Sequence, residues 1–260
     1  MSGIDRLRRI MARLRDPAGG CPWDREQDWA SIAPHTIEEA YELADAIARG
    51  EPEAVRDELG DVLFQVVFQS RIAEERGLFD FDAVATSIAD KLERRHPHVF
   101  ADAKIENSAA QARAWEQHKR AERVARGQGV GALDGVTLGL PALTRATKLG
   151  ARAARVGFDW SDTRGVIEKV REELDELQDE IDKGDRSRTH EELGDLLFAL
   201  AQGARHLGVD AEAALRDANA KFERRFRQVE AHLAAEGRTP VDVGMEQLEA
   251  LWVRAKQELG

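Results

Sequence analysis

Cysteine is almost absent from this sequence of 260 residues, because Cys21 stands alone. One cysteine cannot form a disulfide within the chain or supply a cysteine-based zinc site, and it favours a reducing cytoplasm. No uninterrupted apolar run approaches about 18 residues, which excludes a membrane-spanning helix. The N-terminal stretch also lacks the apolar core and cleavage site of a secretory signal. It predicts instead an amphipathic helix that buries Ile4, Leu7, Met11 and Leu14.

Positive charge is also in short supply. The chain has 38 Lys and Arg against 49 Asp and Glu, which gives a formal net charge of −11. This balance argues against a protein that wraps nucleic acid through a broad basic face, so we expect no stable nucleic-acid binding. A P-loop, a His-Glu-x-x-His motif and a Ser/His/Asp arrangement are missing as well.

Strand-type alternation of polar and apolar residues is scarce, and helical periodicity takes its place. Val166, Val170, Leu174, Leu177 and Ile181 recur on one face of a helix. The hydrophobic fraction of 42 % suffices for a folded core. The sequence therefore predicts an all-α fold.

An internal repeat is the most informative feature that is present. Glu58–Phe64 recurs almost unchanged as Glu192–Phe198, at an offset of 134 residues, and Gly50 recurs as Gly184. Each of these glycines is expected to end a helix. Between the copies, four glycines fall within residues 127–135, a density that does not support a helix.

The repeat predicts two tandem helical-bundle modules, each a helical hairpin with flanking helices. We expect the first over residues 1–123 and the second over residues 141–260, joined by a Gly-rich linker over residues 124–140.

Acidic residues occupy matching places in the two copies. Residues three apart share a helix face, so Glu-Glu-x-x-Glu and a following Glu-x-x-Asp on an antiparallel helix bring carboxylates together. A lone motif of this kind is typical of a solvated face, but its duplication favours a site for Mg²⁺, with Mn²⁺ as a substitute, because a hard cation relieves the repulsion. The candidate metal ligands are Glu39, Glu42, Glu58 and Asp61 in the first copy and Glu173, Glu176, Glu192 and Asp195 in the second.

Basic residues follow the acids in both copies and suit the phosphate oxygens of a triphosphate. These candidate substrate-binding residues are Lys91, Arg94 and Arg95 in the first copy and Lys221, Arg224 and Arg225 in the second. Two further candidates, Lys169 and Arg188, belong to the second copy alone, since the repeat offset places them opposite His35 and Ala54. Trp252 either stacks on a base or covers the core.

The duplicated acidic motif resembles the MazG family of nucleoside triphosphate pyrophosphohydrolases, which belongs to an all-α superfamily with dimeric dUTPases. The similarity extends to Gly20–Asp24 ahead of the first copy, Arg94–Phe100 after its acids and Gly157–Trp160 ahead of the second. It covers essentially the whole chain.

The resemblance implies Mg²⁺-dependent hydrolysis of nucleoside triphosphates to the monophosphate and pyrophosphate by a homodimer. It implies that the eight acids bind metal, that Lys221 and Arg225 bind the triphosphate, and that Trp252 lies beside the nucleotide. Glu38 and Glu172 would assist the attacking water as the catalytic residues. The phosphorus that is attacked stays open.

Three other functions are known for helical proteins of this kind. A ferritin-like di-iron oxidase needs a second Glu-x-x-His, and the counterpart of Glu93–His96 ends in Phe226. Phosphoribosyl-ATP pyrophosphohydrolase usually needs only one short module, so the duplication argues against it. A non-catalytic helical scaffold for a nucleotide or a partner would be favoured by the loss of ligand acids, and no acid is missing from either copy.

The sequence favours the second copy as the main catalyst, because its two additional cations suit a polyanionic substrate. The apolar segments Val62–Phe68 and Leu196–Leu200 cannot be buried by a helical hairpin alone. We therefore expect a symmetric homodimer.

Overall fold

The computed structural model describes residues 2–103, 106–125, 127 and 131–260. These residues form helices and connecting turns, and no strand occurs among them, which confirms the predicted all-α fold. The chain divides into two compact units, over residues 1–119 and 120–260. The division falls close to the predicted linker, of which residues 126 and 128–130 lie outside the described part of the chain. The exact limits of the linker stay a prediction.

The helices of the first unit are α1 (Gly3–Leu14), α2 (Pro22–Glu26), α3 (Trp29–Arg49), α4 (Pro52–Glu75), α5 (Phe81–Arg95), α6 (Pro97–Phe100) and the start of α7 (Ser108–Ala125). After the end of α7, the second unit contains α8 (Ala142–Ala154), α9 (Thr163–Lys183), α10 (Arg186–His206), α11 (Ala211–Ala235), the short 3₁₀ helix η1 (Pro240–Asp242) and α12 (Met245–Leu259).

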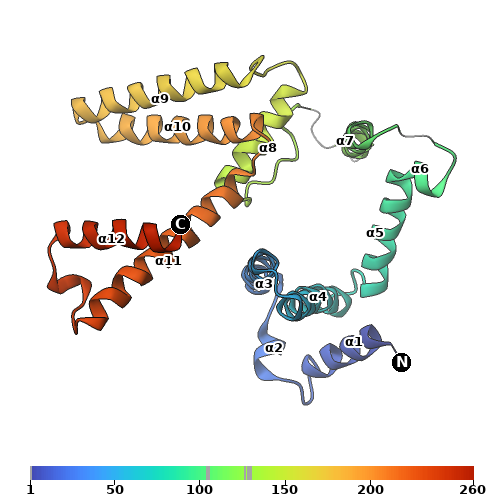
Figure 1. Ribbon diagram of the computed structural model, residues 1–260. Helices are drawn as coiled ribbons and strands as arrows, with labels where there is room; N and C mark the ends of the chain where they lie inside the picture. Colours follow the sequence, from blue (N-terminus) through green and yellow to red (C-terminus); the bar gives the residue numbers. More distant parts are fainter. Residues whose placement is uncertain (1, 104–105, 126, 128–130) are drawn as a thin grey trace. The chain divides into compact units, whose positions relative to one another are not determined.

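Each unit is built around an antiparallel hairpin of two long helices, α3–α4 in the first and α9–α10 in the second (Figure 1). Gly50 and Gly184 end the first helix of each hairpin in the left-handed conformation, with φ of 70° and 72°. A side chain with a Cβ would be strained there, which explains why glycine recurs at both positions. Pro52 opens α4 in its first turn, and the Asp185 side chain caps α10. The predicted hairpins are therefore confirmed.

The core of the first unit forms where α1 packs across α4. Met11, Phe68 and Ile72 are buried there, and Ile4, Leu7 and Leu14 pack against them, as the amphipathic pattern predicted. In the second unit a separate core holds α11 against α12, with Val229, Leu233 and Ala255 at its centre.

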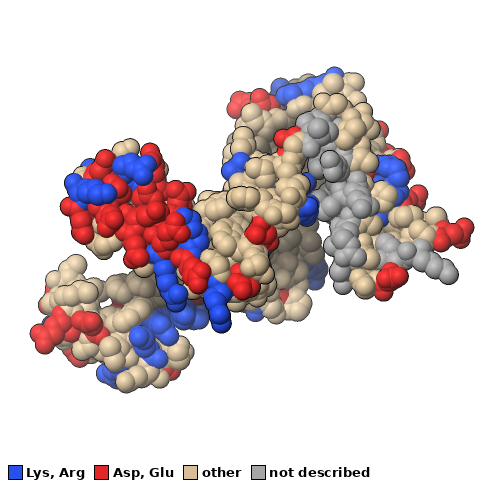
Figure 2. All heavy atoms as spheres, turned by 90° about the horizontal axis from the view of Figure 1, so that it is seen from above, with Lys and Arg blue, Asp and Glu red and all other residues tan. Residues whose placement is uncertain are grey.

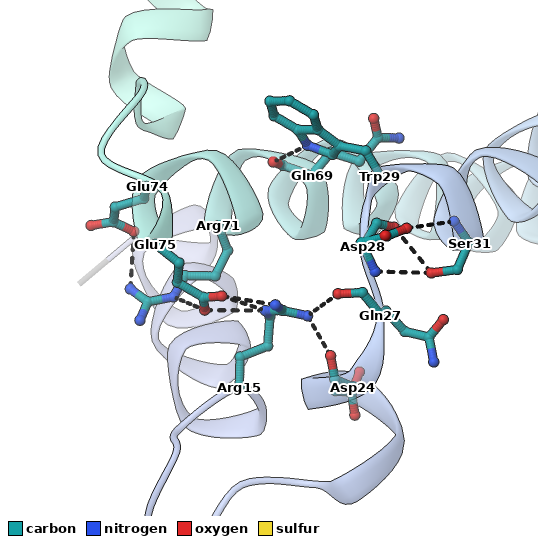
Figure 3. Close-up of polar contacts among 10 residues, drawn as sticks. All are labelled: Arg15, Asp24, Gln27, Asp28, Trp29, Ser31, Gln69, Arg71, Glu74 and Glu75. Carbon is teal, nitrogen blue, oxygen red and sulfur yellow. Dashed lines mark hydrogen bonds and ion pairs between the residues drawn. The ribbon is translucent and has the colours of Figure 1, made fainter.

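Arg15 fastens the segment that leads into α3 onto α4 (Figure 3). Its buried guanidinium donates to the carboxylate of Glu75 at 2.8–3.1 Å and to the backbone carbonyls of Asp24 and Gln27. Arg71 donates to Glu75 as well, at 2.9 Å. Burial opposes the ionised form of Glu75, but the two arginines outweigh it and lower the pKa of this carboxyl. The result is a fixed entry into the helix that carries the first acidic motif.

Several apolar side chains on the hairpins remain uncovered within one chain. On α4 they are Leu59, Leu63 and Val66, and on α10 they are Leu193, Leu197 and Leu200, at 39–52 % exposure. Leu174 and Ile181 of the predicted α9 stripe are also about half exposed, whereas Val166 is buried. Despite this apolar surface, none of the described helices is long and apolar enough to cross a membrane.

Candidate metal and nucleotide site

The first acid cluster forms where α3 faces α4. One carboxylate oxygen each from Glu39, Glu58 and Asp61 lies within 4.8 Å of the other two. Burial raises the pKa of Glu39, and the negative charges of Asp61, Glu42 and Glu58 raise it further. We call these three residues the first cluster. A bound cation would relieve the repulsion among these three carboxylates.

The second acid cluster occupies the equivalent place between α9 and α10. Glu173, Glu176 and Glu192 bring one oxygen each within 4.8 Å of one another. Glu173 and Glu192 are buried, at 5 % and 7 % exposure. The Oε2 atom of Glu173 is buried without a hydrogen-bond partner among the described residues. We call these three residues the second cluster.

Glu42 and Asp195 do not belong to these groups of three, although both were predicted as ligands. Both side chains are exposed. Glu42 lies on α3 with Glu39, and Asp195 lies on α10 with Glu192. Their part in ligation therefore stays a prediction. Glu38 and Glu172 are exposed next to Glu39 and Glu173.

Two cations hold the acids of the second cluster. The Nζ atom of Lys169 lies 2.8 Å from Glu173 and 2.8 Å from Glu172. The Arg188 guanidinium lies 2.8 Å from Glu192 on one side and 2.8 Å from Glu191 on the other. The hydrogen bond to Glu172, then the bond to Glu173, raises the pKa of Lys169 well above its usual value.

The first cluster has no such cations. His35 and Ala54 occupy the positions equivalent to Lys169 and Arg188, and His35 approaches Glu38 at 3.5 Å rather than a cluster acid. Among the described residues, no lysine or arginine forms an ion pair with Glu39, Glu58 or Asp61.

Figure 2 shows how charge is distributed over the second hairpin. A dense group of acidic side chains gathers over α9 and α10, and basic side chains lie at its border. Lys169, Arg171 and Arg188 are among the basic residues of these helices.

The predicted triphosphate-binding residues outside the hairpins lie on α5 and α11. Arg94 donates to the carbonyl of Asp90, and the Arg95 guanidinium lies 4.8 Å from the centre of the Trp115 ring. Lys91 lies one turn earlier on α5. None of the contacts that the structure gives for them reaches the first cluster.

On α11, Arg225 donates to the carbonyl of Gly260 at 2.8 Å, while Lys221 and Arg224 are exposed. In the described chain these three residues form no ion pair with the second cluster. Trp252 packs on Phe222, 5.2 Å between ring centres, and borders the core of α11 and α12. Trp252 thus covers core; whether it also stacks on a base stays a prediction.

Sequence reasoning placed Lys169 and Arg188 near the acids but missed that they pair with the cluster acids themselves. The signal was present, because Lys169 precedes Glu173 by four residues and Arg188 precedes Glu192 by four, a spacing that joins opposite charges on a helix. It also missed Gln65, which is buried on α4 one turn after Asp61, with no partner for its Oε1 among the described residues. Ala199 is the equivalent residue in the second unit.

The donor set of both clusters suits a hard divalent cation. It consists of carboxylate oxygens alone, and the unpaired Oε2 atom of buried Glu173 provides a donor that protein groups do not satisfy. Soft metals would require sulfur or imidazole ligands, which neither cluster contains.

Comparison with known proteins matches both units to one family. Residues 27–100 and 163–230 match the MazG nucleotide pyrophosphohydrolase domain, and these two segments contain both acid clusters. A protein of Escherichia coli K12 named nucleoside triphosphate pyrophosphohydrolase is 52 % identical over 260 residues, with 99 % of this chain and 98 % of that protein covered. A Thermotoga maritima protein named nucleoside triphosphate pyrophosphohydrolase/pyrophosphatase MazG is 40 % identical, with 97 % and 95 % covered.

Proposed function

The chain belongs to the MazG family of nucleotide pyrophosphohydrolases, and we propose that its second cluster is the main site at which a nucleoside triphosphate is cleaved to the monophosphate and pyrophosphate. The protein is a hydrolase of phosphoanhydride bonds. The observation that carries the site assignment is the second cluster itself, in which a buried, unpaired glutamate oxygen lies beside two further carboxylates.

The metal ligands in this proposal are Glu173, Glu176 and Glu192, with Asp195 joining them from the turn after Glu192. Their all-oxygen set favours Mg²⁺, and Mn²⁺ can replace it. When bound, the metal neutralises phosphate charge and acidifies the attacking water. In the first unit Glu39, Glu42, Glu58 and Asp61 hold an equivalent ion.

The proposed phosphate-binding residues lie on the second hairpin and on α11. Lys169 and Arg188 already lie 2.8 Å from the cluster acids, so each needs only a rotation of its own flexible side chain to reach a phosphate oxygen nearby. Lys221, Arg224 and Arg225 supply further positive charge for the leaving pyrophosphate, and Trp252 takes the base. Lys91, Arg94 and Arg95 are their counterparts in the first unit.

Glu172 is the proposed acceptor of the water proton, with Glu38 as its equivalent in the first unit. The Nζ atom of Lys169 donates to Glu172 at 2.8 Å. Once Lys169 turns to a phosphate, that carboxylate is free to accept a proton from water.

The working form in this proposal is a homodimer in a reducing cytoplasm. The exposed leucines at one-turn spacing on α10, and the matching apolar residues on α4, support the dimer because a second copy would remove them from water. The single cysteine, Cys21, supports the compartment. Sedimentation at micromolar concentration should give twice the chain mass of 28.9 kDa, and a monomer would contradict the dimer.

The experiment that tests the activity is a product assay with a panel of natural and modified triphosphates and Mg²⁺. We expect equal amounts of monophosphate and pyrophosphate from the preferred substrate, and Glu173→Gln should abolish most of this product. Release of single phosphates would contradict cleavage between the α and β phosphorus atoms, and phosphoribosyl-ATP in the same panel tests the neighbouring activity.

A further inference from the structure

Two acids of each cluster occupy equivalent positions of the repeat, Glu39 with Glu173 and Glu58 with Glu192. The third acid differs, Asp61 in the first cluster and Glu176 in the second, and so do the cations beside the clusters. At the equivalent positions of the repeat, the second unit has Lys169 where the first has His35, and Arg188 where the first has Ala54. Each of these two cations lies 2.8 Å from a cluster acid. The difference therefore falls on the carboxylates that would hold a metal.

In the second unit the ion pairs compensate buried negative charge. The side chain of Glu173 is 7 % exposed and that of Glu192 is 10 % exposed, so neither carboxylate is well solvated by water. Lys169 and Arg188 supply counter-charge to these two carboxylates. A divalent ion that binds Glu173 and Glu192 must therefore compete with the positive charges of Lys169 and Arg188.

In the first unit nothing among the described residues plays this part. One carboxylate oxygen each of Glu39, Glu58 and Asp61 lies within 4.8 Å of the other two, so their negative charges repel one another. A divalent ion relieves the repulsion and displaces no protein cation.

We propose that Lys169 and Arg188 act as built-in competitors of the metal, so that free metal binds the first cluster in preference to the second, and the second cluster takes its metal together with the triphosphate. This inference rests on the proposed function, since it assumes that both clusters bind metal and that the second binds the substrate.

The triphosphate removes the competition in the second unit. Its phosphate oxygens offer Lys169 and Arg188 alternative anionic partners, so Glu173 and Glu192 become available to the metal. Metal and nucleotide then strengthen each other's binding at this cluster, because coupling between two ligands is reciprocal. At the first cluster no such coupling through cations arises.

The test titrates Mn²⁺ alone into the full chain and follows the free ion by electron paramagnetic resonance. We expect a tight site and a second site weaker by about tenfold or more, since two nearby positive charges oppose the ion. Glu39→Gln should remove the tight site and Glu173→Gln the weak one.

Exchange variants supply the matched control, because they swap the cations and leave every cluster acid in place. Lys169→His with Arg188→Ala should raise the affinity of the second cluster for Mn²⁺ by about tenfold. His35→Lys with Ala54→Arg should weaken the first cluster by about tenfold. Far-UV circular dichroism and thermal unfolding of each variant confirm that it is folded.

Three results would overturn the inference: two sites of equal affinity in the unmodified chain, a tighter second cluster, or exchange variants that leave the affinities unchanged. In these cases the acid variants still remove their own sites and the proposed function stands. If neither Glu39→Gln nor Glu173→Gln alters Mn²⁺ binding, the proposed function fails as well.

Discussion

The two acid clusters place the same kinds of ligand on the same kind of hairpin, yet they differ in what faces the carboxylates. In the first unit no lysine or arginine among the described residues forms an ion pair with Glu39, Glu58 or Asp61. In the second unit Lys169 and Arg188 neutralise Glu173 and Glu192. The comparison teaches that equivalent acids on equivalent hairpins can differ in their surroundings, because residues one turn away supply or withhold a cationic partner. In our proposal this difference decides whether a protein cation must be displaced before a metal binds.

The largest expected effect concerns turnover. Glu173→Gln removes a charged ligand from the second cluster and should lower kcat by about 1000-fold, since a loss of about 4 kcal/mol from the transition state corresponds to that factor. The matched variant Glu39→Gln changes the equivalent residue of the first unit and should lower kcat by no more than about threefold. Steady-state pyrophosphate release measures both. A reversed order of the two effects would assign the main site to the first unit.

The next effect separates substrate binding from metal binding. Lys169→His combined with Arg188→Ala should raise KM for the metal–nucleotide complex by about tenfold, because two phosphate-binding charges are lost. The same variant should bind Mn²⁺ alone more tightly than the unmodified chain. Steady-state kinetics measure the rise in KM, and titration of the same protein sample with Mn²⁺ measures the tighter binding of the free metal. A KM that does not change would show that these cations do not contact the substrate.

A third effect compares the anchors of the two units. Arg15→Met should destabilise the first unit by about 3 kcal/mol, because it leaves the carbonyls of Asp24 and Gln27 without this donor and leaves Glu75 with Arg71 as its remaining arginine partner. Arg205→Met should lower the stability of the second unit by only about 1 kcal/mol, since Arg205 is more exposed than Arg15, donates to no backbone carbonyl in the described contacts, and leaves Asp159 paired with His206. Calorimetry that resolves the two unfolding transitions measures both. Equal losses would contradict the difference in burial.

The smallest effect depends on pH. A hydrogen bond from Arg205, helped by His206, lowers the pKa of Asp159 in the folded chain. Its contribution to stability is therefore present above the unfolded value of about 3.9 and is lost as the pH falls below that value towards the folded one. Asp159→Asn should lower the melting temperature at pH 6, and the deficit should shrink between about pH 4 and pH 3. A deficit that is independent of pH would show that the carboxylate charge is not its cause.

Much of this architecture could be predicted from local sequence signals. Gly50 and Gly184 mark the hairpin turns because their left-handed conformation requires glycine. The acid spacing indicates where α3 faces α4 and α9 faces α10, since residues three apart on a helix share a face. The MazG resemblance follows from the same residues, and the family match confirms it.

Other features depend on contacts that the sequence does not reveal. Arg15 and Glu75 are sixty residues apart, and only the docking of α1 on α4 brings them together. Glu42 and Asp195 lie outside the two clusters. Whether a motif residue joins a cluster depends on its side-chain conformation, which the motif does not specify. The exposed stripe on α10 follows the predicted apolar pattern, but its burial requires a partner that one chain does not contain.

The most direct measurement is a crystal structure with Mn²⁺ and α,β-methylene ATP, in which the bond to be cleaved cannot be hydrolysed. We predict anomalous density for the metal beside Glu173, Glu176 and Glu192, the triphosphate against it, and Lys169 and Arg188 moved from the acids to phosphate oxygens. Metal and nucleotide at the first cluster but not at the second, or Lys169 and Arg188 still paired with Glu173 and Glu192 beside a nucleotide bound at the second cluster, would contradict this account.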